Sequence, residues 1–349
     1  MKRPPPVPPR TTGGRPAPAD RPILGFDLGG SRLKAGVVLR GGVVRMEVRD
    51  LPRTGRSPGA TLDFLVEGLR DLLVREGIRE QDLLGLGGGM AGAIRFPQGI
   101  VVQSPHHPEW RGFPLKKALR ERLGIRRVVV DNDANVVALG EARHGAAMGD
   151  PDFLCLTLGS GIGGAVVLGG ELWRGTRGMA GEFGHMPARP GGRRCACGSR
   201  GCLEQYASAE SLRRFAREQR LVARGVIPPG PDAPRSLVEA ARSGNPEALR
   251  AFDEMGHWLA AGIATLVQAL DVPLVVIAGG LAAAFPLFEG RLIREVGGHG
   301  LAPLLQGIRI RPGTLGDAAG VLGAASLLAA GPTERGRGVG NLPLDPGDR

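Results

Sequence analysis

Apolar residues in the first half of the chain recur with the spacings of helices and strands. Between residues 58 and 76 they return roughly every three or four positions, which predicts an amphipathic helix. Its apolar face consists of Leu62, Leu65, Val66, Leu69, Leu72 and Leu73. Short apolar or β-branched runs predict strands over 23–29, 33–39, 43–50, 82–90 and 126–131. Two further helices are predicted over 114–123 and 132–147.

The second half of the chain repeats this alternation of strands and helices. Strands are predicted over 153–159, 162–170, 171–173, 273–280 and 307–312. Helices are predicted over 208–219, 235–243, 246–270, 286–296 and 317–330. Alternating elements of this kind indicate an α/β fold.

The two halves also share a similar segment. GFDLGGSRLKAGVVL and CLTLGSGIGGAVVL align so that Leu28 and Gly29 match Leu158 and Gly159. Glycine-rich hairpins can match by chance, so the repeat is moderate evidence when taken alone. It favours two similar α/β domains that face each other across a central cleft, where ligands commonly bind.

The composition of this 349-residue, 36.4 kDa chain is that of a globular protein. Hydrophobic residues make up 42%, which excludes a mainly disordered chain. The sequence contains no apolar run long enough to span a membrane. The proline-rich, basic start of the chain lacks the apolar region of a secretory signal. We therefore expect a cytoplasmic protein with no membrane partner.

The net charge of +11 raises the question of nucleic-acid binding. The arginines are scattered, however, and the densely basic stretch is confined to the N-terminal tail. Aromatic residues are only 4% of the chain, with Tyr206 its single tyrosine, so platforms for stacking bases are scarce. We expect no specific nucleic-acid partner and ascribe the charge to a general preference for arginine.

Two glycine-rich turns are candidates for phosphate binding, because glycine lets several backbone N–H groups approach one anion. A tight hairpin needs glycine in any case, so one such turn would be weak evidence, whereas two at equivalent positions favour a phosphate clamp. No lysine follows in the P-loop pattern, and no long helix opens after the glycines as in a dinucleotide site. The candidates are Asp27, Gly29, Gly30, Ser31, Arg32, Gly159, Ser160, Gly161, Ile162, Gly163 and Gly164.

The segment Asp131-Asn132-Asp133-Ala134-Asn135 lies between a predicted strand and a predicted helix. Such polar residues can simply cap the helix. Alternatively, one carboxylate acts as a general base that takes the proton of a sugar hydroxyl as a phosphoryl group arrives. The segment by itself does not decide between these two interpretations.

A histidine and three cysteines form the most specific pattern in the chain. One imidazole and three thiolates are the donor set of a structural zinc site, and the glycines between them allow sharp turns. The ligands would be His185, Cys195, Cys197 and Cys202. Incidental cysteines are the other interpretation. A zinc ion would also order the backbone that carries Glu182 and Glu204. Cys155 lies alone in an apolar stretch and is expected to be inert.

Taken together, these motifs resemble those of the ROK family of sugar kinases and repressors, within the actin-like ATPase superfamily. FDLGGSRLKAGVV and LTLGSGIGG are similar to the two phosphate motifs, with Ser31 and Ser160 where threonine is usual. DNDAN is similar to the family's E-N-D-A-N motif, with Asp131 for the glutamate. GEFGH and CACGSRGCLEQYAS are similar to the zinc signature.

The resemblance implies a role for each candidate residue. Asp133 would be the catalytic base, and Asp27 would help to hold the magnesium–phosphate assembly. Sugar contacts would come from Asn132, Glu182, His185, Glu204 and Gly92. The two glycine turns would bind the phosphates of ATP, and Gly279 with Gly280, at the end of the strand over 273–280, would meet the adenosine. The implied ligands and cofactors are ATP with Mg²⁺, a sugar and a structural Zn²⁺, and a homodimer is expected.

The resemblance also implies a fold of two actin-like, ribonuclease H-like α/β domains. We expect an N-terminal domain over 21–134 and a C-terminal domain over 135–316 that carries a zinc loop at 185–204. A helix over 317–330 is expected to pack back on the N-terminal domain. Residues 1–20 and 331–349 are rich in proline, glycine or charge and are expected to be disordered tails.

The acceptor sugar stays open at this point. SPHHPEW stands where the family often has S-P-N-L-P-G-W, so His106 replaces a common asparagine, and GMAGAIR departs from the family pattern as well. Glucose phosphorylated at its 6-hydroxyl is the first hypothesis. The alternatives are fructose, mannose, N-acetylmannosamine or N-acetylglucosamine as acceptor, and polyphosphate as donor. A sugar-responsive repressor ranks last, since the proline-rich N-terminus cannot form a helix-turn-helix domain.

Overall fold

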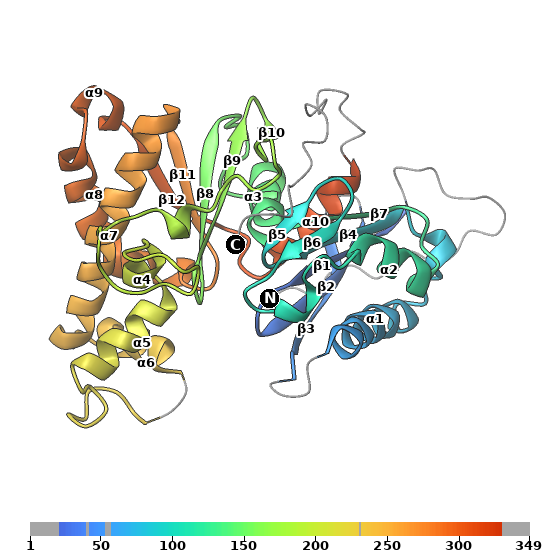
Figure 1. The fold of residues 1–349 in the computed structure, drawn as a ribbon, viewed down its shortest axis with the longest axis horizontal. Coiled ribbons are helices and arrows are strands. Elements are labelled where there is room, and N and C mark those ends of the chain that lie inside the picture. The colour runs from blue at the N-terminus through green and yellow to red at the C-terminus, as the bar shows by residue number, and fades with distance from the viewer. Residues whose placement is uncertain (1–20, 40–41, 53–56, 230–231, 330–349) are drawn as a thin grey trace, which may run out of the picture.

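The computed structural model describes residues 21–329, apart from 40–41, 53–56 and 230–231. The two expected tails lie outside this part of the chain. Within it, the strands form two five-stranded sheets of the same design (Figure 1). The first runs in the order β3-β2-β1-β4-β7 and the second in the order β10-β9-β8-β11-β12. In each, the first three strands are antiparallel and the last two parallel.

The elements of the first sheet and its helices follow the predicted order. The strands are β1 Ile23–Leu28, β2 Arg32–Leu39, β3 Gly42–Asp50, β4 Gly85–Met90 and β7 Val128–Asn132. The helices are α1 Pro58–Arg75, α2 Leu115–Leu123 and α3 Asp133–His144. Ser57 caps helix α1, because its hydroxyl oxygen accepts from the Ala60 N–H at 3.2 Å, and the helix buries the predicted leucine face.

The second sheet is covered by a layer of helices on the side away from the first (Figure 1). Its strands are β8 Phe153–Leu158, β9 Ile162–Leu168, β10 Glu171–Leu172, β11 Leu274–Ala278 and β12 Arg309–Pro312. The helices of this layer are α4 Glu204–Ala207, α5 Ala209–Glu218, α6 Ala233–Arg242, α7 Pro246–Leu270, α8 Phe285–Val296 and α9 Ala302–Leu305, whereas the last helix, α10 Ala318–Ala329, lies elsewhere. A large apolar cluster built on Phe252, Leu259 and Ile277 joins this layer to the sheet.

Helices α3 and α10 lie side by side between the two sheets (Figure 1). Glycines make this packing possible: a Cβ atom on Gly323 would lie 1.6 Å from the Val136 carbonyl oxygen, and one on Gly140 would lie 2.2 Å from that of Ala319. Helix α10 also crosses β4, where a Cβ atom on Gly87 would lie 1.8 Å from the Ala324 carbonyl oxygen. Gly87 of the LGLGGGM segment is therefore required by a helix more than 200 residues away in sequence, whereas Gly88 and Gly89 are required by Phe26 and Val136.

The repeated hairpins are β1–β2 and β8–β9, at the same position of each sheet. Their registers differ by one residue: Leu28 pairs with Leu33, whereas Leu158 pairs with Ile162. The second turn is thus one residue tighter than the sequence alignment implies. That tightness is consistent with its higher glycine content.

The structure differs from the predicted elements mainly at short strands. Residues 93–103 form a hairpin of β5 Ala93–Arg95 and β6 Ile100–Gln103, which has too few residues for its pattern to be recognised. The strand predicted over 171–173 contains two residues only. None of the helices in the described part of the chain is long and apolar enough to cross a bilayer.

Candidate active site

The polar segment at the end of β7 both caps a helix and presents a carboxylate. Asn132 caps α3, because its side-chain oxygen accepts from the N–H groups of Ala134 and Asn135 at 2.8 and 3.2 Å. Its Nδ2 atom donates to the Gly92 carbonyl oxygen at 2.9 Å and to Asp133 Oδ1 at 3.0 Å. Both interpretations of DNDAN are therefore compatible with the geometry: Asn132 is the cap, and it orients Asp133 and contacts Gly92.

Asp133 is partly buried, and its pKa is raised to about 7. Burial is the main cause, since it penalises the charged form, and the negative charge of Asp27 adds to it. Hydrogen bonding from the Ala134 N–H opposes the shift. A carboxyl group that titrates near neutral pH can accept a proton from a hydroxyl and release it again.

Asp27 lies at the end of β1, in contact with a lysine that the sequence analysis did not single out. Lys34 Nζ is 3.3 Å from Asp27 Oδ2 and 3.2 Å from Asp317 Oδ1. Burial raises the pKa of Asp27, and the Lys34 ammonium opposes this. A Cβ atom on Gly320 would lie 2.6 Å from Asp27 Oδ2, so the start of α10 packs directly on this carboxylate.

The first glycine turn packs against the SPHHPEW segment. A Cβ atom on Gly30 would lie 2.5 Å from His106 Cγ. The buried His107 ring has Nε2 3.4 Å from the Gly29 carbonyl oxygen and stacks on Trp110 at 5.5 Å between ring centroids. His106, which replaces a common asparagine of the family, thus contacts the turn predicted to bind phosphate.

The second glycine turn connects the Asp133 corner to the cysteine-rich segment. A Cβ atom on Gly163 would lie 3.2 Å from the Ala134 Cβ, and one on Gly161 would lie 2.6 Å from Glu204 Oε2. At Gly279 the backbone φ is +84°, and a Cβ atom there would lie 2.6 Å from the Leu158 carbonyl oxygen. The Gly279–Gly280 turn is therefore next to this second turn, as two parts of one nucleotide site would need to be.

The four predicted zinc ligands come together. The ligand atoms of His185, Cys195, Cys197 and Cys202 all lie within 4.8 Å of one another. Cys195 Sγ is 3.7 Å from His185 Nδ1, and Cys197 Sγ is 3.6 Å from Cys202 Sγ. Three thiols and an imidazole at this spacing fit Zn²⁺.

The two carboxylates beside this cluster lie on either side of the His185 ring. Glu204 Oε1 is 3.6 Å from His185 Nδ1, whereas Glu182 Oε2 is 3.8 Å from His185 Nε2. The Nδ1 edge of the ring therefore faces the thiols, and the Nε2 edge faces Glu182. This arrangement would let His185 bind a metal through one nitrogen and a substrate hydroxyl through the other.

Sequence reasoning missed a contact between the two halves of the molecule. Arg174, which follows β10, donates through Nε to Asp131 Oδ2 at 2.8 Å, and its guanidinium carbon lies 3.9 Å from the centre of the Phe96 ring. Asp131 is 1% exposed, and its other oxygen accepts from Asn135 Nδ2 at 2.9 Å. In a chain so rich in arginine, no local signal distinguishes Arg174.

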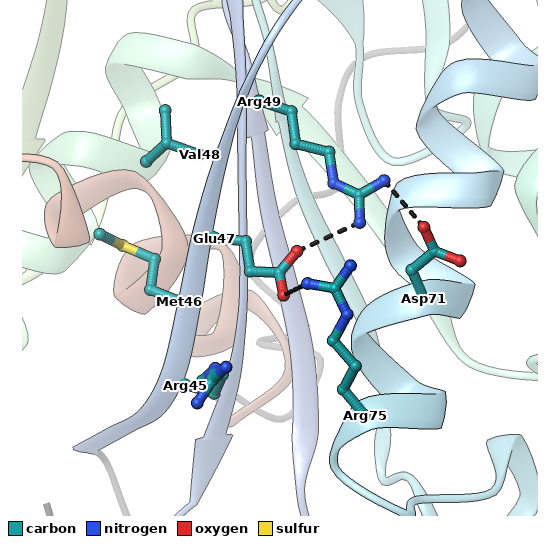
Figure 2. Close-up of a pocket in the computed structure, with 7 residues that line it drawn as sticks. All are labelled: Arg45, Met46, Glu47, Val48, Arg49, Asp71 and Arg75. Carbon is teal, nitrogen blue, oxygen red and sulfur yellow. Dashed lines mark hydrogen bonds and ion pairs between the residues drawn. The ribbon is translucent and has the colours of Figure 1, made fainter.

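One pocket of the described surface lies away from all of these residues. It is a shallow hollow between β3 and α1, lined by Arg45, Arg49 and Arg75 together with Glu47 and Asp71 (Figure 2). Arg49 pairs with Glu47 at 3.1 Å and with Asp71 at 3.0 Å, and Arg75 also pairs with Glu47. The charges of this hollow are largely matched internally, so we assign it no ligand.

Comparisons with known proteins bear on the chain as a whole. The model of the ROK family matches residues 23–330. The sequence is 34% identical to a glucokinase of Streptomyces coelicolor over 320 residues, which cover 87% of this chain and 96% of that protein. It is 27% identical to the xylose repressor of Bacillus subtilis over 292 residues, 83% of this chain and 72% of the repressor.

The fold is also similar to that of solved structures. The crystal structure of a ROK family glucokinase from Streptomyces griseus, in complex with glucose and AMPPNP, matches with a TM-score of 0.76 and 32% sequence identity. The match covers 88% of this chain and 98% of that one. The likeness therefore extends over nearly the whole described part of the protein.

Proposed function

The chain belongs to the ROK family, and we propose that this member is a glucokinase that transfers the γ-phosphoryl group of ATP to the 6-hydroxyl of glucose. The broader assignment, an ATP-dependent sugar kinase, follows from the glucokinase relatives and from the likeness to a glucokinase structure that holds glucose and AMPPNP. The choice of glucose among sugars is the proposal.

The observation that carries the proposal is the position and pKa of Asp133. Its carboxyl group titrates near pH 7 and stands at the start of α3, where the next residue, Ala134, lies against Gly163 of the second glycine turn and the charge of Asp27 acts on it from the first. In the proposed reaction Asp133 takes the proton of the sugar hydroxyl while that oxygen attacks the γ-phosphorus and the bond to ADP breaks. Asn132 Nδ2 donates to the carboxyl group of Asp133, and Asn132 Oδ1 caps the first turn of α3 by accepting from the Ala134 N–H. A base fixed in this way contributes about 10²–10⁴-fold in rate.

The backbone N–H groups of the two glycine turns would bind the phosphates of ATP, and the Gly279–Gly280 turn would contact the adenosine. Mg²⁺, when bound with ATP, would neutralise charge on the transferred group. The carboxylate of Asp27, beside the first turn, would help to hold Mg²⁺ and the phosphates. Lys34 holds Asp27 in place from the neighbouring strand.

Sugar hydroxyls would be bound by Asn132, Glu182, His185, Glu204 and the backbone at Gly92. A zinc ion in the Cys3His set would supply structural order only, since all four ligands come from the protein and no position stays open. His185 would keep its ring fixed with Nε2 directed away from the thiols, ready to contact a hydroxyl.

A panel of substrates tests this assignment. The purified chain would be assayed with glucose, fructose, mannose, N-acetylmannosamine and N-acetylglucosamine, each with ATP and with polyphosphate. We expect the highest kcat/KM for glucose with ATP. A higher value for another sugar, or for polyphosphate, would replace the acceptor or the donor in the proposal. Asp133→Asn is the control and should lose about 10²–10⁴-fold in kcat with little change in sugar affinity.

The similarity to a xylose repressor makes a sugar-responsive repressor the second candidate. A repressor needs to bind a sugar but has no need of a base that titrates near pH 7. Phosphorylation of sugar at enzyme concentrations far below substrate supports the kinase. Specific operator binding in a gel-shift assay at physiological salt, without turnover, would support the repressor. The homodimer expected from the resemblance is likewise a proposal, which sedimentation of the purified chain would test.

A further inference from the structure

A second cluster of metal-binding side chains lies on the outer helical layer. Among the described residues, the groups of three or more that could hold an ion are the Cys3His set and one other, made of His257, Glu295 and His299. His257 is on α7, Glu295 on α8, and His299 ends the short 3-10 helix Gly297–His299. We propose that these three side chains bind a divalent transition-metal ion such as Zn²⁺, independently of the proposed function.

Both imidazoles face the same carboxylate oxygen. His257 Nδ1 is 2.6 Å and His299 Nε2 is 4.0 Å from Glu295 Oε2, and the ligand atoms all lie within 4.8 Å of one another. The His257–Glu295 hydrogen bond joins two of the side chains, and the His299 ring lies edge-on to the His257 ring with 5.8 Å between ring centroids. In a tetrahedral zinc site the ligand atoms are about 3.3–3.5 Å apart, as bond lengths of about 2.0–2.1 Å require. Since the ligand atoms already lie within 4.8 Å of one another, each separation needs to change by about 1.5 Å or less to reach that spacing.

The surrounding contacts hold the three ligands in place. Arg291 pairs with Glu295 Oε1 and, at 3.0 Å, with Asp253 Oδ2, which leaves Oε2 directed at the histidines. Gln268 on α7 fixes the chain around His299, since its Nε2 donates to the His299 carbonyl at 3.4 Å and its Oε1 accepts from the Leu301 N–H at 2.9 Å. The cluster is therefore ordered by neighbours that are not themselves ligands, as in known metal sites.

The chemistry of the three donor groups determines which metal ion the site prefers and how tightly it binds. Two imidazoles and one carboxylate favour Zn²⁺, Co²⁺ or Ni²⁺ over Mg²⁺ or Ca²⁺. The side chains are partly exposed, from 26% for Glu295 to 39% for His257, so water can complete the coordination. The nearby positive charge of Arg291 weakens cation binding. We therefore expect this site to be weaker than the Cys3His set and to fill after it.

Cobalt titration of the metal-free full chain distinguishes the two sites, because thiolate ligands give intense charge-transfer absorption that imidazole and carboxylate do not. We expect the first equivalent of Co²⁺ to produce that absorption. The second should add only the weaker visible bands. Uptake of a single equivalent by the wild-type chain would overturn the proposal.

Three variants assign the second equivalent. Glu295→Gln and His299→Ala should weaken it by at least about tenfold without changing the charge-transfer absorption of the first. Glu289→Gln removes an exposed carboxylate from the same helix and should change neither. Since His299 is at an exposed helix end, the fold should survive its removal, which circular dichroism would verify. Unchanged binding of the second equivalent in both ligand variants would refute the assignment.

Discussion

Asp27 and Asp133 approach each other across Gly89. A Cβ atom on Gly89 would lie in ordinary contact with both, 3.5 Å from Asp27 Oδ1 and 3.5 Å from the Asp133 Cα, whereas its 2.4 Å distance to Val136 Cγ2 is what requires glycine at this point. The negative charge of Asp27 is the second cause, after burial, of the raised pKa of Asp133. The residue that would help to bind the phosphates therefore also tunes the residue that would act as base.

The first prediction concerns the pH dependence of turnover. With a pKa of about 7, Asp133 is mostly protonated below that pH and cannot accept a proton, so kcat/KM should rise through about pH 7 and then level off. Initial rates measured from about pH 5 to about pH 9, at fixed free Mg²⁺, would show this.

Removing the neighbouring charge checks the cause of that profile. Asp27→Asn should move the midpoint to lower pH whatever it does to the maximal rate, since the repulsion from Asp27 is lost. A wild-type profile that is flat across neutral pH would mean that Asp133 is not the base, or that its proton transfer does not limit the rate.

The same pKa shift predicts a stability change. The carboxyl of Asp133 has its pKa raised from 3.8 to about 7 in the folded chain, so its stabilising contribution is complete below about pH 4 and is lost as the pH rises through about 7. Asp133→Asn removes the charge and should raise the free energy of unfolding at pH 8 by up to about 4 kcal/mol, and by less than half as much near pH 5. Urea denaturation at both pH values measures it. Equal effects at both would show that the charge is not the cause.

The parts of the site that sequence reasoning found are those encoded locally. The glycine turns, the DNDAN segment and the Cys3His ligands are each contiguous or nearly so, and the structure brings each set together. The leucine face of α1 was likewise readable from its spacing.

The features of the site that sequence reasoning missed are contacts between segments that are distant in the sequence. Lys34 with Asp317, Arg174 with Asp131, and His107 with Gly29 each join residues that no local pattern relates. Arginine and histidine also occur in many other contexts along this chain. The glycines of β4 could be read as a turn signal, whereas close packing requires them: α10 approaches Gly87, Phe26 approaches Gly88 and Val136 approaches Gly89.

Zinc removal should affect the two substrates unequally. The metal would fix His185 and the carboxylates beside it, which belong to the proposed sugar site, whereas the first glycine turn belongs to other elements. Chelation should therefore weaken glucose binding more than binding of an ATP analogue, as isothermal titration calorimetry would measure. Cys197→Ser should reproduce this effect, and Ser199→Ala, in the same turn, should not. Equal losses for both ligands would argue against a local role for the metal.

Arg174 should be a positioning residue for the proposed base. Its ion pair with Asp131 is partly buried, and Asp131 directly precedes the Asn132–Asp133 pair. Arg174→Leu leaves a buried carboxylate without its cation, which typically costs about 3–5 kcal/mol. It should also lower kcat more than it raises the KM for sugar, because Asn132 and Asp133 lose their anchor.

The double variant Arg174→Leu with Asp131→Asn separates charge from geometry. The double variant should recover most of the stability that Arg174→Leu loses, because the asparagine that replaces Asp131 is neutral and no buried charge is then left without a partner. It should not recover kcat, because nothing then links this corner of β7 to the segment after β10. Full recovery of kcat along with stability would mean that Arg174 only neutralises Asp131, and that the base keeps its position through the Asn132 cap alone.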